Sequence, residues 1–319
     1  MTAALPTPPA GYTARAMRLE DAPLIAQRSA VHTSALLGFA KHSAEDVANY
    51  LRDPGVDLAT DGWMVQGPDG FAGSATAVAI TGGTHVNVDI LGEEPAVLGW
   101  LLDQAERRAH EVSQSTGRRE VVVRLGVIRQ DARLAAVVRA RGYAVGTSVH
   151  RMRITFDGPV APPAVPDGVV VRRGAPDEAS RRAAHAVLME SFATQPGTLP
   201  RPFAEWVASR ESRSTFDWSQ VTIAELDGRP VGMTECNDNF VSTDNCGYVG
   251  RLAVVPPARG RGLAKFLLRD AFAVDHAAGR TGTILHVDSS NPTPAVALYT
   301  GAGMGPDVIS DIWTRTIEI

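Results

Sequence analysis

The stretch "ARGRGLAKFLL", residues 258 to 268, alternates two arginines with two glycines directly before an apolar run with helical spacing. It follows "YVGRLAVV", residues 248 to 255, whose apolar and β-branched residues predict a central strand. The predicted order is therefore strand, glycine loop and helix. In that order the backbone N–H groups of residues 259 to 264 converge at the positive end of a helix dipole, which favours an anion.

Gly260 and Gly262 support a phosphate site, because a backbone without side chains lets a diphosphate approach closely. Arg259 and Arg261 add positive charge. A plain surface turn with solvated arginines is the alternative, and it would suffice for an isolated Gly-x-Gly. The flanking strand and helix favour the phosphate site.

The composition restricts the class of protein. The chain has 319 residues, enough for two ordinary domains, and a formal net charge of −4, which argues against nucleic acid as a partner. Its two cysteines and scattered histidines predict neither a disulfide framework nor a metal site. The first residues do not resemble a signal peptide, and no apolar run approaches the roughly 20 residues of a membrane span. We expect a cytoplasmic protein without a membrane partner.

The two halves of the chain share a plan. "DGPVAPPAVPDG", residues 157 to 168, is rich in proline and glycine and predicts a linker. Each half holds an Asp-Gly turn between two predicted strands, which is a strong hairpin signal. Three landmarks recur in order at offsets of 157, 158 and 161 residues: Arg15 with Arg172, Gly70 with Gly228, and Gly142 with Gly303. We therefore expect an α/β (α+β) protein with two similar domains, residues 1–156 and 169–319, each a mixed sheet flanked by helices.

The second half resembles the GCN5-related N-acetyltransferase (GNAT) family, in a tandem arrangement like that of mycothiol synthases. "VVPPARGRGLA" is similar to the family's acyl-CoA segment, V-x-P-x-x-R-G-x-G-x-G/A, and "LHVDSSNPTPAVALYTGAGM" is similar to its next strand and helix. The resemblance implies that the strand pairs with the pantetheine arm, that the loop holds the pyrophosphate, and that an Asn faces the cofactor. The implied acyl-CoA residues are Leu252, Ala253, Val254, Val255, Arg259, Gly260, Arg261, Gly262, Leu263, Ala264 and Asn291.

The resemblance also implies a catalytic acid. Tyr299 matches the Tyr that often protonates the departing CoA thiolate in this family. The alternative is a core Tyr whose hydroxyl is bonded to a backbone carbonyl. Asp311, near the start of the final predicted strand, is a candidate for contact with the substrate.

Acetyl transfer needs a base that takes a proton from the acceptor ammonium. Glu235, on the strand after the second Asp-Gly turn, is the main candidate, and an exposed strand residue is the alternative interpretation of it. Asp288 and His286 are further candidates. The position most common in the family, on the cofactor strand, holds Tyr248 or Arg251 and no carboxylate.

The first half lacks these chemical groups. Glu93 and Glu94 stand where the second half has its arginines and glycines, and acidic side chains there repel a diphosphate. The offset of 161 places Val138 opposite Tyr299 and Gln130 opposite Asn291. We predict that the first half keeps the fold without productive acyl-CoA binding, as a scaffold or as part of the substrate cleft.

The sequence thus predicts an acetyl-CoA-dependent N-acetyltransferase without a metal, in which a small-molecule amine attacks the thioester directly. Two alternatives remain open: a mycothiol synthase, which acetylates a cysteinyl amino-sugar, and a non-catalytic CoA-binding or scaffold protein. We expect the acceptor pocket in residues 189–206, which include Phe192, Phe203 and Trp206, and in residues 236–247. These segments do not identify the acceptor, and the sequence does not indicate an oligomeric state.

Overall fold

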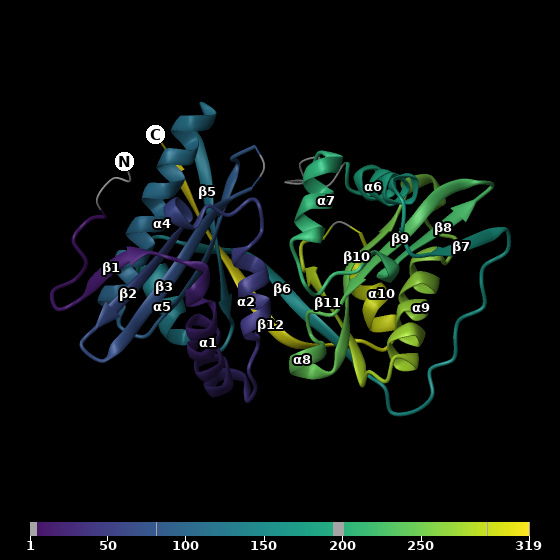
Figure 1. Ribbon diagram of the computed structural model, residues 1–319, viewed down its shortest axis with the longest axis horizontal. Coiled ribbons are helices and arrows are strands. Elements are labelled where there is room, and N and C mark those ends of the chain that lie inside the picture. Colours follow the sequence, from purple (N-terminus) through teal and green to yellow (C-terminus); the bar gives the residue numbers. More distant parts are fainter. Residues whose placement is uncertain (1–4, 81, 194–200, 292, 319) are drawn as a thin grey trace. The chain divides into compact units, whose positions relative to one another are not determined.

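A computed structural model describes residues 5–80, 82–193, 201–291 and 293–318 (Figure 1). The chain folds into two compact units. Unit 1 comprises Met1–Ser148 and Ser310–Ile319, and unit 2 comprises Val149–Ile309. The ranges predicted from the sequence, 1–156 and 169–319, differ from these units at the last strand of each half. No described helix is both long and apolar enough to cross a membrane.

Unit 1 is a mixed sheet with helices packed on it. Its elements are β1 (Thr13–Ala16), α1 (Ala22–Leu37), α2 (Ala44–Leu51), α3 (Leu58–Asp61), β2 (Gly62–Gly67), β3 (Gly70–Ala79), β4 (His85–Gly92), α4 (Pro95–Thr116), β5 (Glu120–Ile128), α5 (Ala132–Ala140), the start of β6 (Ala144–Thr155) and the end of β12 (Gly305–Glu318). The strand order is β1-β2-β3-β4-β5-β12, with β4 and β5 parallel. The apolar face of α4, with Leu98, Leu101 and Leu102, is buried against β3, β4 and β5.

Unit 2 repeats this plan. Its elements are the end of β6, β7 (Val169–Arg173), α6 (Glu178–Phe192), α7 (Phe203–Glu211), β8 (Val221–Leu226), β9 (Arg229–Asn237), α8 (Val241–Asp244), β10 (Cys246–Val254), α9 (Leu263–Ala277), β11 (Gly282–Asp288), α10 (Ala295–Gly301) and the start of β12. The strand order is β6-β11-β10-β9-β8-β7, with β10 and β11 parallel. Equivalent strands hold equivalent places in both sheets, which confirms the predicted α/β class and the duplicated plan.

The hairpins form where the sequence predicts them. Asp227 and Gly228 join β8 to β9 with φ values of 52° and 75°. A tight hairpin needs left-handed backbone at both central residues, and Asp followed by Gly tolerates it. Gly70, with φ of 97°, closes the equivalent turn between β2 and β3.

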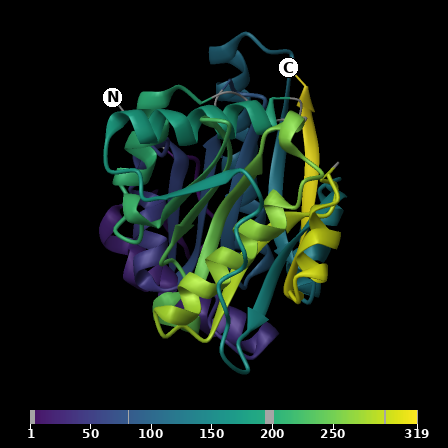
Figure 2. The same ribbon diagram turned by 90° about the vertical axis from the view of Figure 1, so that its right-hand side faces the viewer.

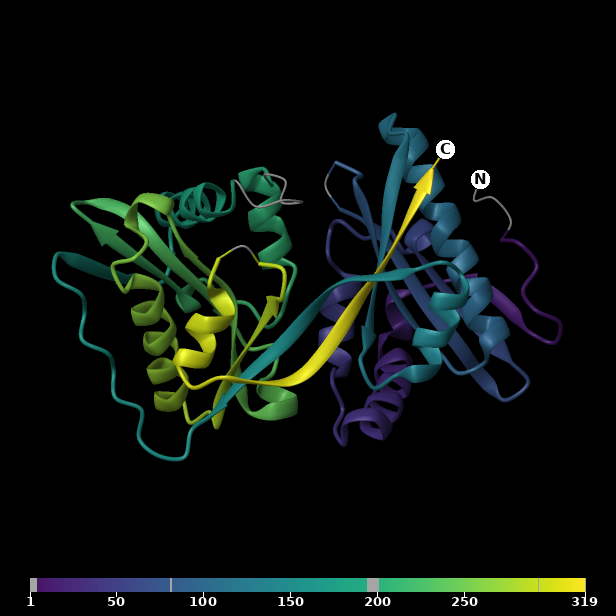
Figure 3. The same ribbon diagram turned by 180° about the vertical axis from the view of Figure 1, so that it is seen from behind.

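The last strands of the two halves are exchanged. Val149–Thr155 of β6 pair with β11 in unit 2, whereas Ser310–Glu318 of β12 pair with β5 in unit 1. Both ribbons can be followed in Figure 3, β6 in teal and β12 in yellow. Because β5 and β11 have the same place in two similar sheets, the edge of either can accept either last strand. A strand pattern alone does not specify the edge that the strand joins.

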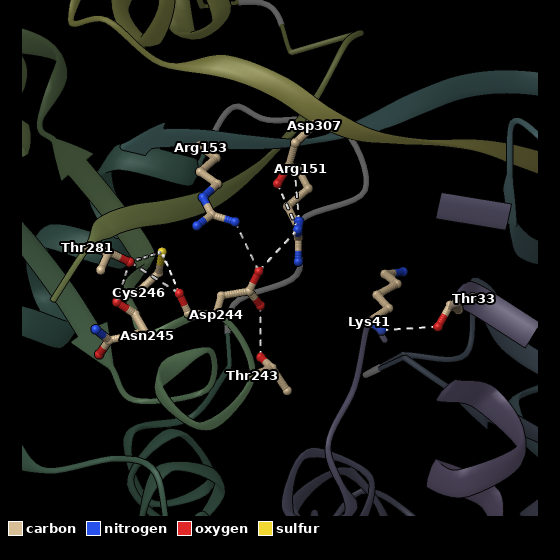
Figure 4. Close-up of polar contacts among 10 residues, drawn as sticks. All are labelled: Thr33, Lys41, Arg151, Arg153, Thr243, Asp244, Asn245, Cys246, Thr281 and Asp307. Atoms are coloured by element: carbon tan, nitrogen blue, oxygen red, sulfur yellow. Dashed lines mark hydrogen bonds and ion pairs between the residues drawn. The ribbon is translucent and has the colours of Figure 1, made fainter. Parts of the chain in front are cut away.

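Two arginines, the buried Arg151 and the half-buried Arg153, anchor the exchanged strand β6 in unit 2. Arg151 is 1% exposed, and its Nε and Nη2 donate to the Asp307 carboxylate of β12 at 2.9 and 2.7 Å (Figure 4). Arg153 donates through Nη1 to Asp244 of α8 at 3.2 Å. The Arg151 guanidinium also lies 5.5 Å from the ring centroid of Phe240. Bidentate pairs fix orientation as well as charge, so they set the place of β6 beside β12 in this unit.

Gly282 offers a test of the exchanged pairing. It lies opposite Thr155 of β6, and a Cβ on it would be 2.2 Å from the backbone oxygen of Ile154. A backbone atom cannot give way without breaking the pairing, so we expect Gly282→Ala to lower the free energy of unfolding by ~3 kcal/mol or more. Gly305→Ala, at a position where a Cβ meets nothing within 4 Å, is the control. Equal stability of both variants in denaturant titrations would contradict the β6–β11 pairing.

Asp275 of α9 is expected to make unfolding depend on pH. Its carboxyl is 7% exposed and accepts from the Thr283 hydroxyl at 2.6 Å. Burial raises the pKa of Asp275 to about 6, although Thr283 and Arg280 favour the charged form. The folded protein therefore binds this proton more tightly than the unfolded chain does. The resulting stabilisation is complete below pH ~4 and is lost as the pH rises through the folded-state pKa.

We expect this one group to lower the free energy of unfolding by about 3 kcal/mol across that pH range. Asp275→Asn should remove the dependence, because the amide oxygen still accepts from Thr283 and does not titrate. Denaturant titrations of wild type and variant between pH 4 and 7 measure the difference. Parallel curves for the two proteins would show that Asp275 is charged throughout.

Candidate functional site

The strands of unit 2 present two faces with different chemistry. α9 packs against β9, β10 and β11 on one face (Figure 2). A Cβ on Gly232 of β9 would contact Leu267 of α9 at 3.0 Å. Because side chains alternate along a strand, Glu235 points to the opposite face, where Arg210 of α7 meets it. We call this opposite side of β9, β10 and β11 the α7 face.

The strands β10 and β11 separate part-way along their length. They pair from Cys246 with Gly282 to Val249 with Leu285. At Gly250 the register between β10 and β9 shifts, which marks a bulge. Beyond it β10 follows β9 and β11 follows β6. Within the described structure, residues 251–254 therefore have no strand partner on the β11 side, and this open edge can pair with an extended ligand.

The loop after β10 ends this open edge in an anion site. Gly260 and Gly262 have φ values of 76° and 77°, and a Cβ on either would meet nothing within 4 Å. Glycine at these two positions allows the left-handed backbone and leaves the space above the loop open. Gly262 is the N-cap of the 15-residue helix α9. Among described residues, no acceptor takes the N–H groups of residues 260–264, so they remain available to an anion at the positive end of the helix.

Arg259 has a different place from the one its charge suggests. Its Nε donates to the backbone oxygen of Val254 at 3.1 Å, and its Nη2 donates to that of Ser191 on α6 at 2.9 Å. Its backbone N–H donates to Pro256 at 3.2 Å. The converging N–H groups therefore begin at Gly260, one residue later than the sequence suggested, and the Arg259 side chain holds the loop against α6. Arg261 is exposed.

Tyr299 lies within α10, and Asn291 lies in the segment before that helix. The Tyr299 side chain packs against the core between α9 and β11, and its hydroxyl has no hydrogen-bond partner in the described part of the chain. Burial, and then the nearby Tyr248, raise the pKa of Tyr299 above its usual value, so it carries its proton at neutral pH. The backbone-bonded core Tyr considered above is not what the structure shows. Asn291 accepts from the N–H and hydroxyl of Thr293 at 3.0 and 2.8 Å through Oδ1.

Glu235 is buried, so its interpretation as an exposed strand residue is wrong. It is 3% exposed, and its Oε2 accepts a hydrogen bond from Arg210 Nε at 3.1 Å and lies 3.1 Å from Nη2 of the same guanidinium. The Arg210 guanidinium lies 4.9 Å from the ring centroid of Trp206. Burial lowers the pKa of Arg210 to about 10 in spite of Glu235. The sequence contains no signal for this pair, since the two residues are 25 positions apart on different elements.

Tyr248 and His286 form a pair on the α7 face. The Tyr248 hydroxyl lies 3.1 Å from His286 Nδ1, and the two rings are 5.6 Å apart. Phe240 packs edge-on against Tyr248 at 5.1 Å. Arg251, opposite Glu235 on β10, donates through Nη1 to the oxygen of Gly250. From the sequence, Tyr248 is notable only because a carboxylate is absent at its position.

The remaining predicted residues have other places. Asp288 accepts from the N–H and hydroxyl of Ser290 at 2.8 and 2.7 Å, at the end of β11. Asp311 belongs to unit 1 because β12 is exchanged, and it accepts from Arg129 and Ser148 there, at 2.6 and 2.8 Å. That Asp311 contacts the substrate stays a prediction. Trp206 is 1% exposed and packs on Phe203, so both belong to the core between α6 and α7. Residues 194–200 of the expected acceptor segment lie outside the described residues.

The equivalent region of unit 1 keeps the strand separation and has two glutamates in place of the glycine loop. β4 and β5 pair from His85 with Val122 to Val88 with Leu125 and then part. The connection to α4 is only Glu93 and Glu94, the latter as N-cap. A cavity of about 270 Å³ adjoins it, lined by α1, the β2–β3 turn and the end of β4. That this unit does not bind acyl-CoA productively stays a prediction.

Known proteins that are similar to this chain agree with the geometry of the unit 2 site. The sequence model of the Acetyltransferase (GNAT) family matches residues 186–304, which include the loop, the open edge and Tyr299. A GCN5-related N-acetyltransferase from Sphaerobacter thermophilus is similar over 98% of both chains, with 26% identity and a TM-score of 0.82. Residues 186–304 therefore form a GNAT-family domain. A tandem GNAT protein from the clavulanic acid biosynthesis pathway has the same fold over 96% of this chain and 98% of its own, at 17% identity and a TM-score of 0.69.

Curated proteins similar to this chain include two named mycothiol acetyltransferase. Those of Thermomonospora curvata and Frankia casuarinae are 31% and 33% identical over 170 and 153 residues. The matches cover 53% and 46% of this chain and 55% and 44% of the relatives, so they span about half the length of each protein. Within the described residues, no group of three or more His, Cys, Asp or Glu side chains is placed to hold a metal ion.

Proposed function

We propose that unit 2 is an acetyl-CoA-dependent N-acetyltransferase acting on a small-molecule amine. The observation that carries the proposal is that the open edge of β10 leads directly to the unpartnered N–H groups of residues 260–264. An extended pantetheine arm fits such an edge, and a diphosphate fits such a loop. The family of the chain and the activity named for its relatives support the same donor.

In this proposal each predicted residue has a defined task. The backbone of Leu252–Val255 pairs with the pantetheine arm. The N–H groups of Gly260–Ala264 hold the diphosphate, Arg261 adds positive charge, Asn291 faces the cofactor, and Arg259 stiffens the loop from behind. Acetyl-CoA supplies a thioester whose acetyl group is already activated toward an amine.

Tyr299 is the proposed acid. Its hydroxyl keeps its proton at neutral pH and has no described protein partner, so it is able to protonate the departing thiolate sulfur. The sequence predicts Glu235 as the base for the acceptor ammonium. A proton on that carboxylate would disrupt the buried ion pair with Arg210.

A mycothiol synthase is the second candidate, because the relatives from two bacteria carry that activity in their names. Its acceptor would be a cysteinyl amino-sugar. The non-catalytic alternative predicts acetyl-CoA binding without turnover.

Calorimetric titration with acetyl-CoA tests the proposal first. We expect one site per chain, in unit 2. A panel of small amines that includes a cysteinyl amino-sugar then follows, with CoA release and acetylated product measured by chromatography and mass spectrometry. Turnover of the cysteinyl amino-sugar at a rate well above that of every other amine would favour the function of a mycothiol synthase. Two binding sites would show that Glu93 and Glu94 do not exclude acyl-CoA from unit 1, and no binding would refute the proposed function.

A further inference from the structure

We infer that Tyr248 and His286 form the path by which the acceptor amine loses its proton, with Tyr248 touching the amine and His286 receiving the proton through it. The inference rests on the proposed function of unit 2. In this inference the pair takes the place of Glu235 as the base. Tyr248 lies on β10, the proposed cofactor strand, which holds no carboxylate at this position.

The location of the pair is the first argument. Tyr248 and His286 lie next to the last paired residues of β10 and β11, Val249 and Leu285, where the two strands part. Both point to the α7 face, because Val249 and Leu285 pack toward α9 and neighbours alternate. Tyr299 approaches the same point from α10, and its pKa responds to Tyr248. A thioester held along the open edge of β10 would therefore lie between the two tyrosines.

The chemistry of the pair is the second argument. Burial raises the pKa of Tyr248 above its usual value, against the charges of Arg251 and Arg213, so this phenol does not lose its proton alone at neutral pH. The Tyr248 hydroxyl therefore needs a partner that accepts its proton while it takes up the proton of the amine. His286 Nδ1 lies 3.1 Å from this hydroxyl. The imidazole is exposed, so it can pass the proton on to water.

The protons balance in this scheme. The acceptor ammonium gives one proton to Tyr248 Oη while Tyr248 gives its own to His286 Nδ1. The neutral nitrogen then forms the N–C bond, and the C–S bond breaks. Tyr299 protonates the sulfur and recovers a proton from the amide nitrogen. One proton leaves for water for each acetyl group transferred.

Glu235 is less suited to the same task. The hydrogen bond and the ion-pair contact from Arg210 both end on its Oε2, and the side chain is 4% exposed. Asp288 is occupied by Ser290 at the end of β11. Arg251 on β10, Glu235 on β9 and Arg213 after the end of α7 are the charged groups that act on the pKa of Tyr248. The other charged groups on neighbouring elements are Arg210 on α7, Asp288 on β11 and Arg151 beneath Phe240.

The test uses the full chain and the best amine from the panel, with kcat followed from pH 5.5 to 9.5. We expect Tyr248→Phe and His286→Gln each to lower kcat ~10- to 100-fold at pH 7 and to recover toward wild type at high pH, where the amine is already neutral. The double variant should be no slower than the slower single variant, because the two residues act as one path. Asp288→Asn, on the same strand and face as His286, should stay within about threefold of wild type.

Circular dichroism and acetyl-CoA titration of each variant establish that the fold and donor site are intact. Losses below threefold, or losses of equal size at every pH, would overturn the inference while leaving the proposed function in place. A pH-dependent loss in Glu235→Gln alone would return the base to Glu235. A wild-type protein that acetylates no amine would overturn the proposed function and the inference together.

Discussion

Gly262→Asp is expected to weaken acetyl-CoA binding at least ~100-fold. Gly262 has a φ of 77° and begins α9, and a side chain there meets no protein atom within 4 Å. Asp tolerates left-handed backbone better than most residues, so the fold should accept the change. The new carboxylate would occupy the space for the diphosphate and repel its charge at close range, where a loss of ~3 kcal/mol corresponds to the expected factor.

Gly279→Asp is the matched control for this variant. Gly279 follows the other end of α9, has the same φ of 77° and also has open space around a Cβ. It therefore reproduces the backbone strain and the added charge far from the loop. We expect its Kd for acetyl-CoA within about threefold of wild type by calorimetric titration. Equal weakening in both variants would mean that the loss comes from α9 as a whole, and the loop would no longer be the diphosphate site.

Tyr299→Phe is expected to lower kcat ~100-fold with little change in KM for acetyl-CoA. The hydroxyl has no described protein partner, so its removal leaves no polar group of the described structure unsatisfied. The ring keeps its packing between α9 and β11. What is lost is the proton that the departing sulfur takes up in the transition state, which affects kcat rather than binding.

Tyr143→Phe in unit 1 controls for the loss of a buried phenol. Tyr143 follows α5, the counterpart of α10, and its hydroxyl donates to Glu106 at 3.2 Å. It is expected to keep kcat within twofold of wild type, with some loss of stability. A Tyr299→Phe enzyme with wild-type kcat would remove Tyr299 as the acid and leave the thiolate to depart unprotonated.

The local elements of this protein follow from its sequence. The hairpin at Asp227 and Gly228, the strand before residue 256 and the helix after Gly262 are each specified within a short window, because φ preferences, side-chain alternation and helix periodicity act over a few residues. The duplicated plan is visible for the same reason, since each copy repeats those windows in order. The loop that ends the open edge of β10 is a local feature too, because Gly260 and Gly262, which adopt left-handed backbone there, can be recognised from the sequence.

Only the tertiary structure decided which groups surround the site. Arg259 turns to the Ser191 oxygen on α6, Glu235 is buried under Arg210, and Tyr248 finds His286 on the next strand. Each partner is distant in sequence. The packing of whole helices and strands brings the partners together, and the residues around a single position do not indicate that packing. The exchange of β6 and β12 is the extreme case. The two units have the same strand plan, so β5 and β11 offer equivalent edges. The sequence pattern specifies that β6 and β12 are strands. The contacts formed by the whole chain select the edge that each of them joins.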